Sequence, residues 1–170
     1  MEIEEFIQKS LGKWKSMRSG HSLAFQQFEE VISTITITVA SKSDEAINQL
    51  IIESGYRREQ VRFPFKIEWN AQSNWDQSKE DNNTKGSSII IPIPTSKKEG
   101  VMIRTSGYSE NMNVLTNYNF SKDGTIFLKS KYEYTIAEER IWFISENLRC
   151  RSSVLKSSKS SAILQTSFAS

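Results

Sequence analysis

Apolar and polar residues alternate along most of this chain, which is typical of strands with one buried and one solvated face. The clearest run is residues 32–39, ISTITITV, in which apolar and hydroxyl residues alternate over eight positions. Nine further segments show strand patterns between turn residues. They cover residues 14–28 with an interruption near 19–20, 62–69, 88–93, 101–105, 114–120, 125–134, 139–144, 148–156 and 162–169.

Short turns join the predicted strands, and two of these turns, KKEG at 97–100 and SKDG at 121–124, end in glycine. Short connections favour antiparallel neighbours. About ten such strands with few helices predict an all-β fold, an antiparallel barrel closed on itself, because closure removes the exposed edges of a sheet. A β-sandwich is the structural alternative that this pattern leaves open.

Two short segments have helical spacing instead. Apolar residues recur at helical intervals in residues 3–9, and a glycine follows. The second helix is predicted over residues 43–55, with Ser43 as its N-cap, acidic residues in its first turn and Gly55 at its end. We therefore expect one or two short helices beside the barrel.

The length of 170 residues suits a single domain, 1–170, with one core. Two polar stretches, residues 78–87 and 156–161, interrupt the strand pattern and are predicted to be loops. The first ten residues, MEIEEFIQKS, are acidic and lack the basic start and apolar run of a signal peptide. No segment reaches the roughly 18 consecutive apolar residues of a membrane span. We expect a cytoplasmic protein without a membrane partner.

The composition argues against several classes of function. A net charge of +2, with scattered Lys and Arg, does not predict nucleic-acid binding. The single cysteine cannot form an internal disulfide, and Cys150 is interpreted as a small buried residue, with a reactive thiol as the minor alternative. One histidine and no glycine-rich phosphate loop argue against metal centres and nucleophilic triads. That histidine, His21, follows Gly20 in a predicted bend, where a surface or capping role competes with ligand contact.

The segment 137–153, AEERIWFISENLRCRSS, places ionic groups at alternate positions of two predicted strands. If residues 145–147 form a three-residue loop, opposed residues share one face. The opposed pairs are then Ile144 with Leu148, Phe143 with Arg149, Ile141 with Arg151 and Glu139 with Ser153. A two-residue turn would shift this register by one place and separate the charges. The alternative is a solvated edge with surface ion pairs, each contributing roughly 0–1 kcal/mol.

A barrel of this size can enclose one small molecule, and the 137–153 face has the groups to hold it. Arg149 and Arg151 can each bind a carboxylate through paired charge-assisted hydrogen bonds. Glu139 can accept hydrogen bonds from ligand N–H groups. Trp69 and Trp75 can stack on a flat conjugated ligand, with core or rim packing as the alternative for each.

Three segments taken together resemble the S-type phycobiliprotein lyases, the family that attaches linear tetrapyrrole bilins to cysteines of light-harvesting phycobiliproteins. The segments are residues 12–21, GKWKSMRSGH; EW at 68–69 with NWD at 74–76; and residues 137–153 followed by the last strand. The resemblance covers nearly the whole chain in the same order. Members of this family are similar in fold to lipocalins and fatty-acid-binding proteins.

The resemblance implies binding and delivery of a reduced phycobilin, either phycoerythrobilin or phycocyanobilin, which is a substrate and not a prosthetic group. The protein would present the ethylidene-bearing ring of the pigment to a cysteine thiol of an apo-phycobiliprotein, where a thioether forms. The expected target is a β-subunit, with phycoerythrin the preferred phycobiliprotein. A bilin reductase and a second copy of this chain, through the apolar strand at 88–93, are further candidate partners.

The resemblance also implies roles for residues of the 137–153 segment. Arg149 and Arg151 would hold the two propionates of the bilin. Glu139 would contact or protonate the pyrrole nitrogens, and Ser153 would add a hydrogen bond. Glu139 and Arg149 are accordingly the candidate catalytic residues.

Elsewhere, the resemblance implies that Trp69 and Trp75 flank the chromophore and that Arg18 and His21 line or close the mouth of the barrel. Met17 departs from the family pattern, which has a polar glutamine there.

Two other classes of function stay open: a carrier of a fatty acid or another carboxylated ligand without a transfer step, and an assembly protein whose barrel is filled by its own side chains.

Overall fold

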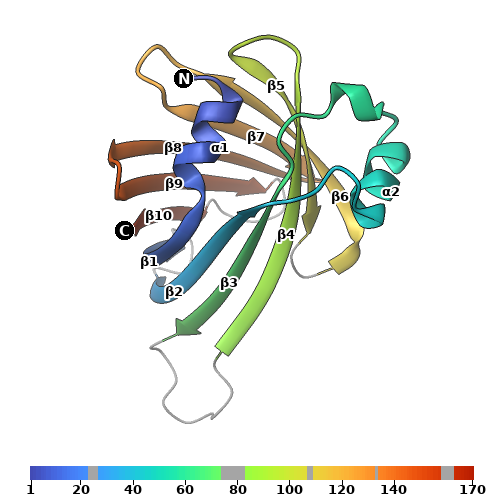
Figure 1. The fold of residues 1–170 in the computed structure, drawn as a ribbon. Helices are drawn as coiled ribbons and strands as arrows, with labels where there is room; N and C mark the ends of the chain where they lie inside the picture. Colours follow the sequence, from blue (N-terminus) through green and yellow to red (C-terminus); the bar gives the residue numbers. More distant parts are fainter. Residues whose placement is uncertain (23–26, 74–82, 107–108, 133, 158–162) are drawn as a thin grey trace.

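Ten antiparallel strands form a closed barrel in which each strand pairs with its neighbours in sequence and the last pairs with the first. The computed structural model describes residues 1–22, 27–73, 83–106, 109–132, 134–157 and 163–170 (Figure 1). The strands are β1 (Gly12–Ser22), β2 (Gln27–Val39), β3 (Phe65–Ser73), β4 (Asn83–Pro94), β5 (Glu99–Ser106), β6 (Ser109–Phe120), β7 (Ile126–Tyr132), β8 (Thr135–Ser145), β9 (Leu148–Ser157) and β10 (Ile163–Ala169). The predicted barrel is confirmed, and the sandwich is excluded.

The first predicted strand differs from the structure in where it is interrupted. β1 continues through Ser19 and Gly20, which pair with Glu30 and Glu29 of β2. The Ser19 and Thr166 hydroxyls also share a hydrogen bond of 2.9 Å between β1 and β10. The predicted bend near 19–20 is therefore wrong, because both edges of β1 are hydrogen-bonded there. β1 ends instead at Ser22.

The run at 32–39 lies within β2 as predicted, but its apolar residues face both ways. Ile35 and Ile37 line the interior. Ile32 lies on the outer face and is 37% exposed. It pairs there with Met17 of β1. Ile32 is an odd number of positions from Ile35 and Ile37, so its side chain faces the other side of the strand. Apolar and hydroxyl residues therefore alternate strictly only from Ile35 onward.

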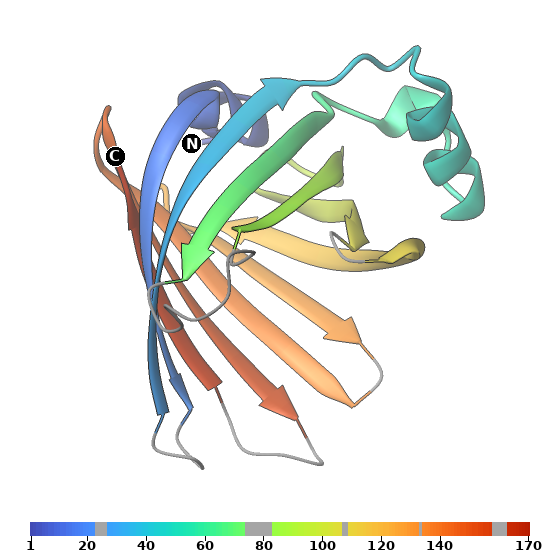
Figure 2. The same ribbon diagram turned by 90° about the horizontal axis from the view of Figure 1, so that it is seen from below.

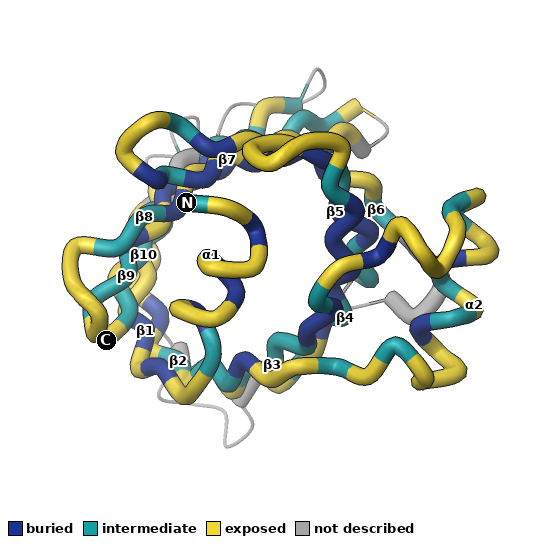
Figure 3. The backbone as a smooth tube through the Cα atoms, turned by 45° about the horizontal axis from the view of Figure 1, so that its top comes forward, coloured by how far each residue is buried: buried dark blue, intermediate teal, exposed yellow. Residues whose placement is uncertain are grey.

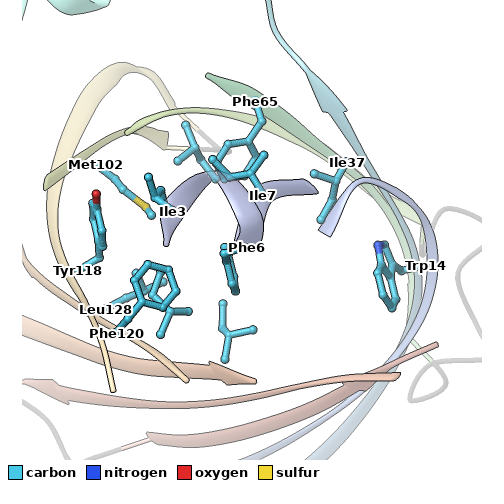
Figure 4. Close-up of a cluster of buried hydrophobic side chains, with 13 residues drawn as sticks. Ile3, Phe6, Ile7, Trp14, Ile37, Phe65, Met102, Tyr118, Phe120 and Leu128 are labelled. Atoms are coloured by element: carbon cyan, nitrogen blue, oxygen red, sulfur yellow. The ribbon is translucent and has the colours of Figure 1, made fainter. Parts of the chain in front are cut away.

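Helix α1 (Ile3–Ser10) closes one end of the barrel, where the ring of strands surrounds it (Figure 3). Its apolar face supplies Ile3, Phe6 and Ile7 to the main core, and Trp14 donates its indole N–H to the Ser10 carbonyl at 2.9 Å. Figure 4 shows these side chains meeting residues from the surrounding strands. The other buried members of this core are Ile37, Phe65, Ile90, Met102, Tyr118, Phe120, Ile126, Leu128 and Ile141.

Helix α2 (Glu45–Glu53) lies outside the barrel, beside β4 and β5, and the short 3₁₀ helix η1 (Arg58–Gln60) follows it (Figures 2 and 3). The predicted N-cap is wrong by one residue. Asp44 caps the helix by accepting the Ala46 N–H at 3.0 Å. Ser43 instead shares a hydrogen bond with the Ser41 hydroxyl in the preceding turn. None of the helices in the described ranges is long and apolar enough to cross a membrane.

A second core fills the space between α2 and the barrel, and it explains the apolar strand at 88–93. Ile47 and Ile51 of α2 pack on Ile91 and Ile93 of β4. The intervening Ile90 belongs to the interior core. Both faces of this strand are therefore covered within one chain. The apolar character that suggested a contact with a second copy is accounted for by α2.

Candidate functional site

The β8–β9 hairpin brings the predicted ionic residues together on one face. Glu139 lies opposite Ser153, and Arg149 opposite Phe143, as the sequence predicts. Arg151 is likewise paired with Ile141. Glu139, Arg149 and Arg151 all line the interior of the barrel. The register on which the site depends is confirmed, and these residues do not form a solvated edge.

The turn of this hairpin differs from the predicted three-residue loop. Only Glu146 and Asn147 form the turn, and Ser145 pairs with Leu148. Ile144 is the extra residue of a β-bulge between Phe143 and Ser145, and it is 60% exposed. A two-residue turn alone would have shifted the register by one place, and the bulged residue restores it.

The barrel encloses a cavity of about 570 Å³. Drug-sized ligands occupy pockets of roughly 300–1,000 Å³. The described charged residues that line it are four arginines and two glutamates, which leaves an excess of two positive charges; they are Arg18, Arg104, Arg149, Arg151, Glu29 and Glu139. The remaining wall is mostly apolar or carries small hydroxyls. Such a cavity suits an apolar molecule with two negative groups.

Glu139 lies between two guanidinium groups. Its Oε2 is 2.6 Å from Nη2 of Arg151, and its Oε1 is 3.2 Å from Nη1 of Arg104. The Glu139 side chain is 8% exposed. Burial alone raises the pKa of Glu139, but Arg151 and Arg104 outweigh that effect and hold the pKa below its usual value. Glu139 is therefore a carboxylate at neutral pH, with both oxygens engaged.

Arg149 lies at the end of the cavity that α1 closes. Its guanidinium carbon is 6.0 Å from the centre of the Phe6 ring, within the range of a cation–π contact. No carboxylate in the described part of the chain lies within ion-pair distance of it. Burial, together with the like charge of Arg151, lowers the pKa of Arg149 to about 10. Arg149 remains charged at neutral pH and has no anionic partner among the described residues, so a ligand carboxylate can take that place.

Of the other predicted site residues, some line the cavity and some do not. Trp69 and Arg18 line the cavity. Ser153 is buried beside Glu139 but does not itself line the cavity. Trp75 lies outside the described residues.

His21 does not line the cavity. It faces outward because β1 runs straight through Gly20, so that His21 has the opposite parity to Arg18. Its ring lies 4.8 Å from that of Phe28. Met17, the departure from the family pattern, also faces outward and is 54% exposed. Neither residue is positioned to touch a molecule in the cavity.

Trp69 occupies its place on the wall because the residue opposite it is a glycine. It pairs with Gly86 of β4. A Cβ added at Gly86 would overlap the indole ring. The absence of a side chain at Gly86 therefore lets the indole lie against the β4 backbone.

Arg104 and Glu29 are the charged lining residues that the sequence reasoning missed, and of these Arg104 pairs with Glu139. It lies on β5, two residues after the buried Met102 and on the same face. The sequence signal that could have revealed Arg104 is its position two residues from an apolar residue of the same strand, which places a charge on the face that carries core residues. Its partner Glu139 lies on β8, however, and no local pattern connects these two strands.

Comparisons with known proteins identify the family of this chain. The family model described as CpeS-like protein matches residues 2–170. The chain is 42% identical to chromophore lyase CpcS/CpeS 3 of Trichodesmium erythraeum, over 100% of this chain and 98% of the relative. It is 38% identical over 88% of its length to a Microchaete diplosiphon protein provisionally named phycoerythrobilin lyase CpeS, and the match spans 66% of that protein.

A solved structure gives the same result for the fold. The S-type phycobiliprotein lyase CPES of Guillardia theta superposes with a TM-score of 0.85 at 30% identity, covering 99% of this chain and 90% of that one. The resemblance seen in the three sequence segments is thereby confirmed over the full length. The chain belongs to the CpeS-like family of S-type phycobiliprotein lyases.

Proposed function

We propose that this protein is a bilin lyase that binds a reduced linear tetrapyrrole in its barrel and delivers it to a cysteine of a phycobiliprotein subunit. The observation that carries the proposal is a largely apolar cavity of about 570 Å³ whose wall includes Glu139, Arg149 and Arg151 and whose six charged lining residues leave an excess of two positive charges. A phycobilin offers two propionates, a set of pyrrole N–H groups and a flat conjugated body. Each matches a group on the wall.

In this proposal the two arginines of β9 hold the propionates. Arg149 is ready to do so, because no carboxylate among the described residues occupies it. A propionate beside Arg149 also offsets the desolvation that lowers the pKa of its guanidinium. Arg151 is already paired with Glu139 at 2.6 Å, so a propionate competes with Glu139 for its guanidinium. The two sites are therefore unequal, and Arg149 is the anchor.

Glu139 acts as an acceptor for pyrrole N–H groups and not as a proton donor. Its depressed pKa keeps it ionised, so it has no proton to give near neutral pH. Of the two roles that the family resemblance implied, contact and protonation, the electrostatics favour contact. In this proposal Trp69 flanks the chromophore, and Arg18 of β1, which also lines the cavity, contacts the chromophore or closes the mouth.

The chemical step is an addition that needs no nucleophile from this chain. The S–H bond of the target cysteine adds across the ethylidene double bond of the bilin, with sulfur bonding to the ethylidene carbon and the proton going to the tetrapyrrole. Nothing leaves. Positioning the two reactants supplies the acceleration. Cys150 is not the nucleophile, because it is 1% exposed and its pKa is raised by burial.

The preferred pigment in this proposal is phycoerythrobilin and the target a phycoerythrin β-subunit, supported by the provisional name of the Microchaete relative. A bilin reductase would supply the reduced pigment. Co-expression of this chain with a bilin-synthesis system and an apo-subunit tests both points. The acid-urea absorption spectrum of the purified subunit names the pigment, and cysteine variants of the subunit name the attachment site.

Arg149→Ala should abolish the covalent adduct in this system. Arg140→Ala is the matched control, because Arg140 lies on the outer face of the same hairpin, over the Trp142 ring. A reversible spectral shift without an adduct that survives denaturation would identify a carrier instead of a lyase. Wild-type protein that binds no tetrapyrrole at micromolar concentration would refute both.

A further inference from the structure

Arg104 makes a contact that crosses the interior of the barrel. Its strand, β5, is separated from β8 by β6 and β7 in the barrel order. The contact between Nη1 of Arg104 and Oε1 of Glu139, at 3.2 Å, is therefore made across the cavity and not between neighbouring strands. The Arg104 side chain is 27% exposed and lines the cavity.

Glu139 divides its two oxygens between two arginines. Arg104 takes Oε1, and Arg151 takes Oε2. Because the contacts use different oxygens, one can break while the other persists. A ligand carboxylate that takes Nη2 of Arg151 breaks the Arg151–Glu139 pair. Without Arg104, this exchange would leave the largely buried Glu139 carboxylate without a cationic partner, which is strongly unfavourable.

We propose that Arg104 is a positioning residue, which holds the Glu139 carboxylate in place while Arg151 exchanges Glu139 for a ligand carboxylate. This inference rests on the proposed function, since it concerns how the same cavity accepts a dicarboxylate pigment. Arg149 takes the first carboxylate without competition, and Arg151 takes the second by exchange. Glu139, retained by Arg104, keeps a lone pair directed at the ligand N–H groups.

A double-mutant cycle tests the exchange. Phycocyanobilin affinity is measured by absorbance titration for wild type, Arg104→Gln, Glu139→Gln and the double variant, after circular dichroism has shown that each is folded. Arg104→Gln should weaken binding about tenfold in the wild-type background and less than about twofold in the Glu139→Gln background. Arg104→Lys should restore part of the loss, because an ammonium keeps the charge but not the fork of donors.

A second readout needs no ligand. Carboxyl ¹³C NMR of the free protein follows the titration of Glu139, which is faced by Arg104 from β5 and by Arg149 and Arg151 from β9. Removing Arg104 should raise the pKa of Glu139, and Arg104→Lys should lower it again. Binding to Arg104→Gln should then weaken on acidification at a higher pH than in wild type, because protonated Glu139 loses its role as acceptor.

Three outcomes would overturn the inference: unchanged affinity in Arg104→Gln, an equal loss in both Glu139 backgrounds, or an unmoved Glu139 titration. Its failure is distinct from that of the proposed function. Wild-type protein whose pigment affinity depends on Arg104 as expected, but which forms no adduct, would overturn the lyase activity and leave the exchange standing. Wild-type protein that binds no tetrapyrrole would overturn both.

Discussion

Replacement of Glu139 by Gln should destabilise the folded protein through the loss of one charge. Glu139 is 8% exposed and pairs with Arg104 and Arg151, which are 27% and 43% exposed. Breaking a fully buried ion pair by removing one partner costs roughly 3–5 kcal/mol. Both guanidinium groups keep some water here, which screens their charge. We therefore expect the free energy of unfolding to fall by about 1–3 kcal/mol at pH 7.

The pH dependence of this difference separates charge from shape. The pKa of Glu139 is lower in the folded state than its usual value of 4.5. Its ionic contribution is then fully present above that usual value and is lost as the pH falls through the folded-state pKa. The stability difference between wild type and Glu139→Gln should shrink as the pH falls below about 4.5 and vanish below the folded-state pKa of Glu139, because protonated glutamate resembles glutamine.

Urea unfolding followed by tryptophan fluorescence, between pH 7 and pH 3.5, measures this difference. Glu138→Gln is the matched control. The Glu138 carboxylate is on the same strand but faces outward, where Lys129 and Lys156 pair with it at the surface, and its replacement should change stability little. A Glu139→Gln deficit that stays constant with pH, or no deficit at pH 7, would refute the electrostatic reasoning.

Three further predictions concern neighbouring parts of the structure. Gly86→Ala should displace the Trp69 indole from the cavity wall, shift its fluorescence and weaken tetrapyrrole binding; an unchanged spectrum would contradict the close contact. Cys150 should react with iodoacetamide at pH 8 only after urea unfolding, since the thiol is buried and its pKa is raised; rapid alkylation of the native protein would contradict this burial. Ile91→Ala should cost about 2–5 kcal/mol by opening a cavity under α2, while pigment affinity stays unchanged; a loss of affinity would connect α2 to the site.

The strands could be predicted because their signals are local. Alternation within residues 35–39 and glycine at the end of the turn at 121–124 report on a strand and its turn without reference to the rest of the chain. The two helices were likewise marked by spacing, although the cap of α2 moved from Ser43 to Asp44. Adjacent polar residues can cap a helix with nearly equal energies, so the predicted start of a helix is expected to be wrong by about one residue.

The placement of His21 was beyond such reasoning. A glycine followed by a histidine suits a bend, and the bend would have brought His21 to the mouth. Hydrogen bonding of β1 to both β2 and β10 keeps it extended instead, and parity then directs His21 outward. The outcome depends on closure of the barrel, which pairs the first strand with the last.

The sequence by itself determined that Arg149 and Arg151 share a face, because side chains alternate along one strand, but it placed Glu139 with them in only one of two possible hairpin registers. Only the tertiary structure decided how that register is reached, through a bulge at Ile144 in place of a longer loop. It also decided which cations meet Glu139. Arg104 is 35 residues away, and only the curvature of a closed sheet brings β5 across from β8. Long-range electrostatic partners are set by closure, which no local pattern encodes.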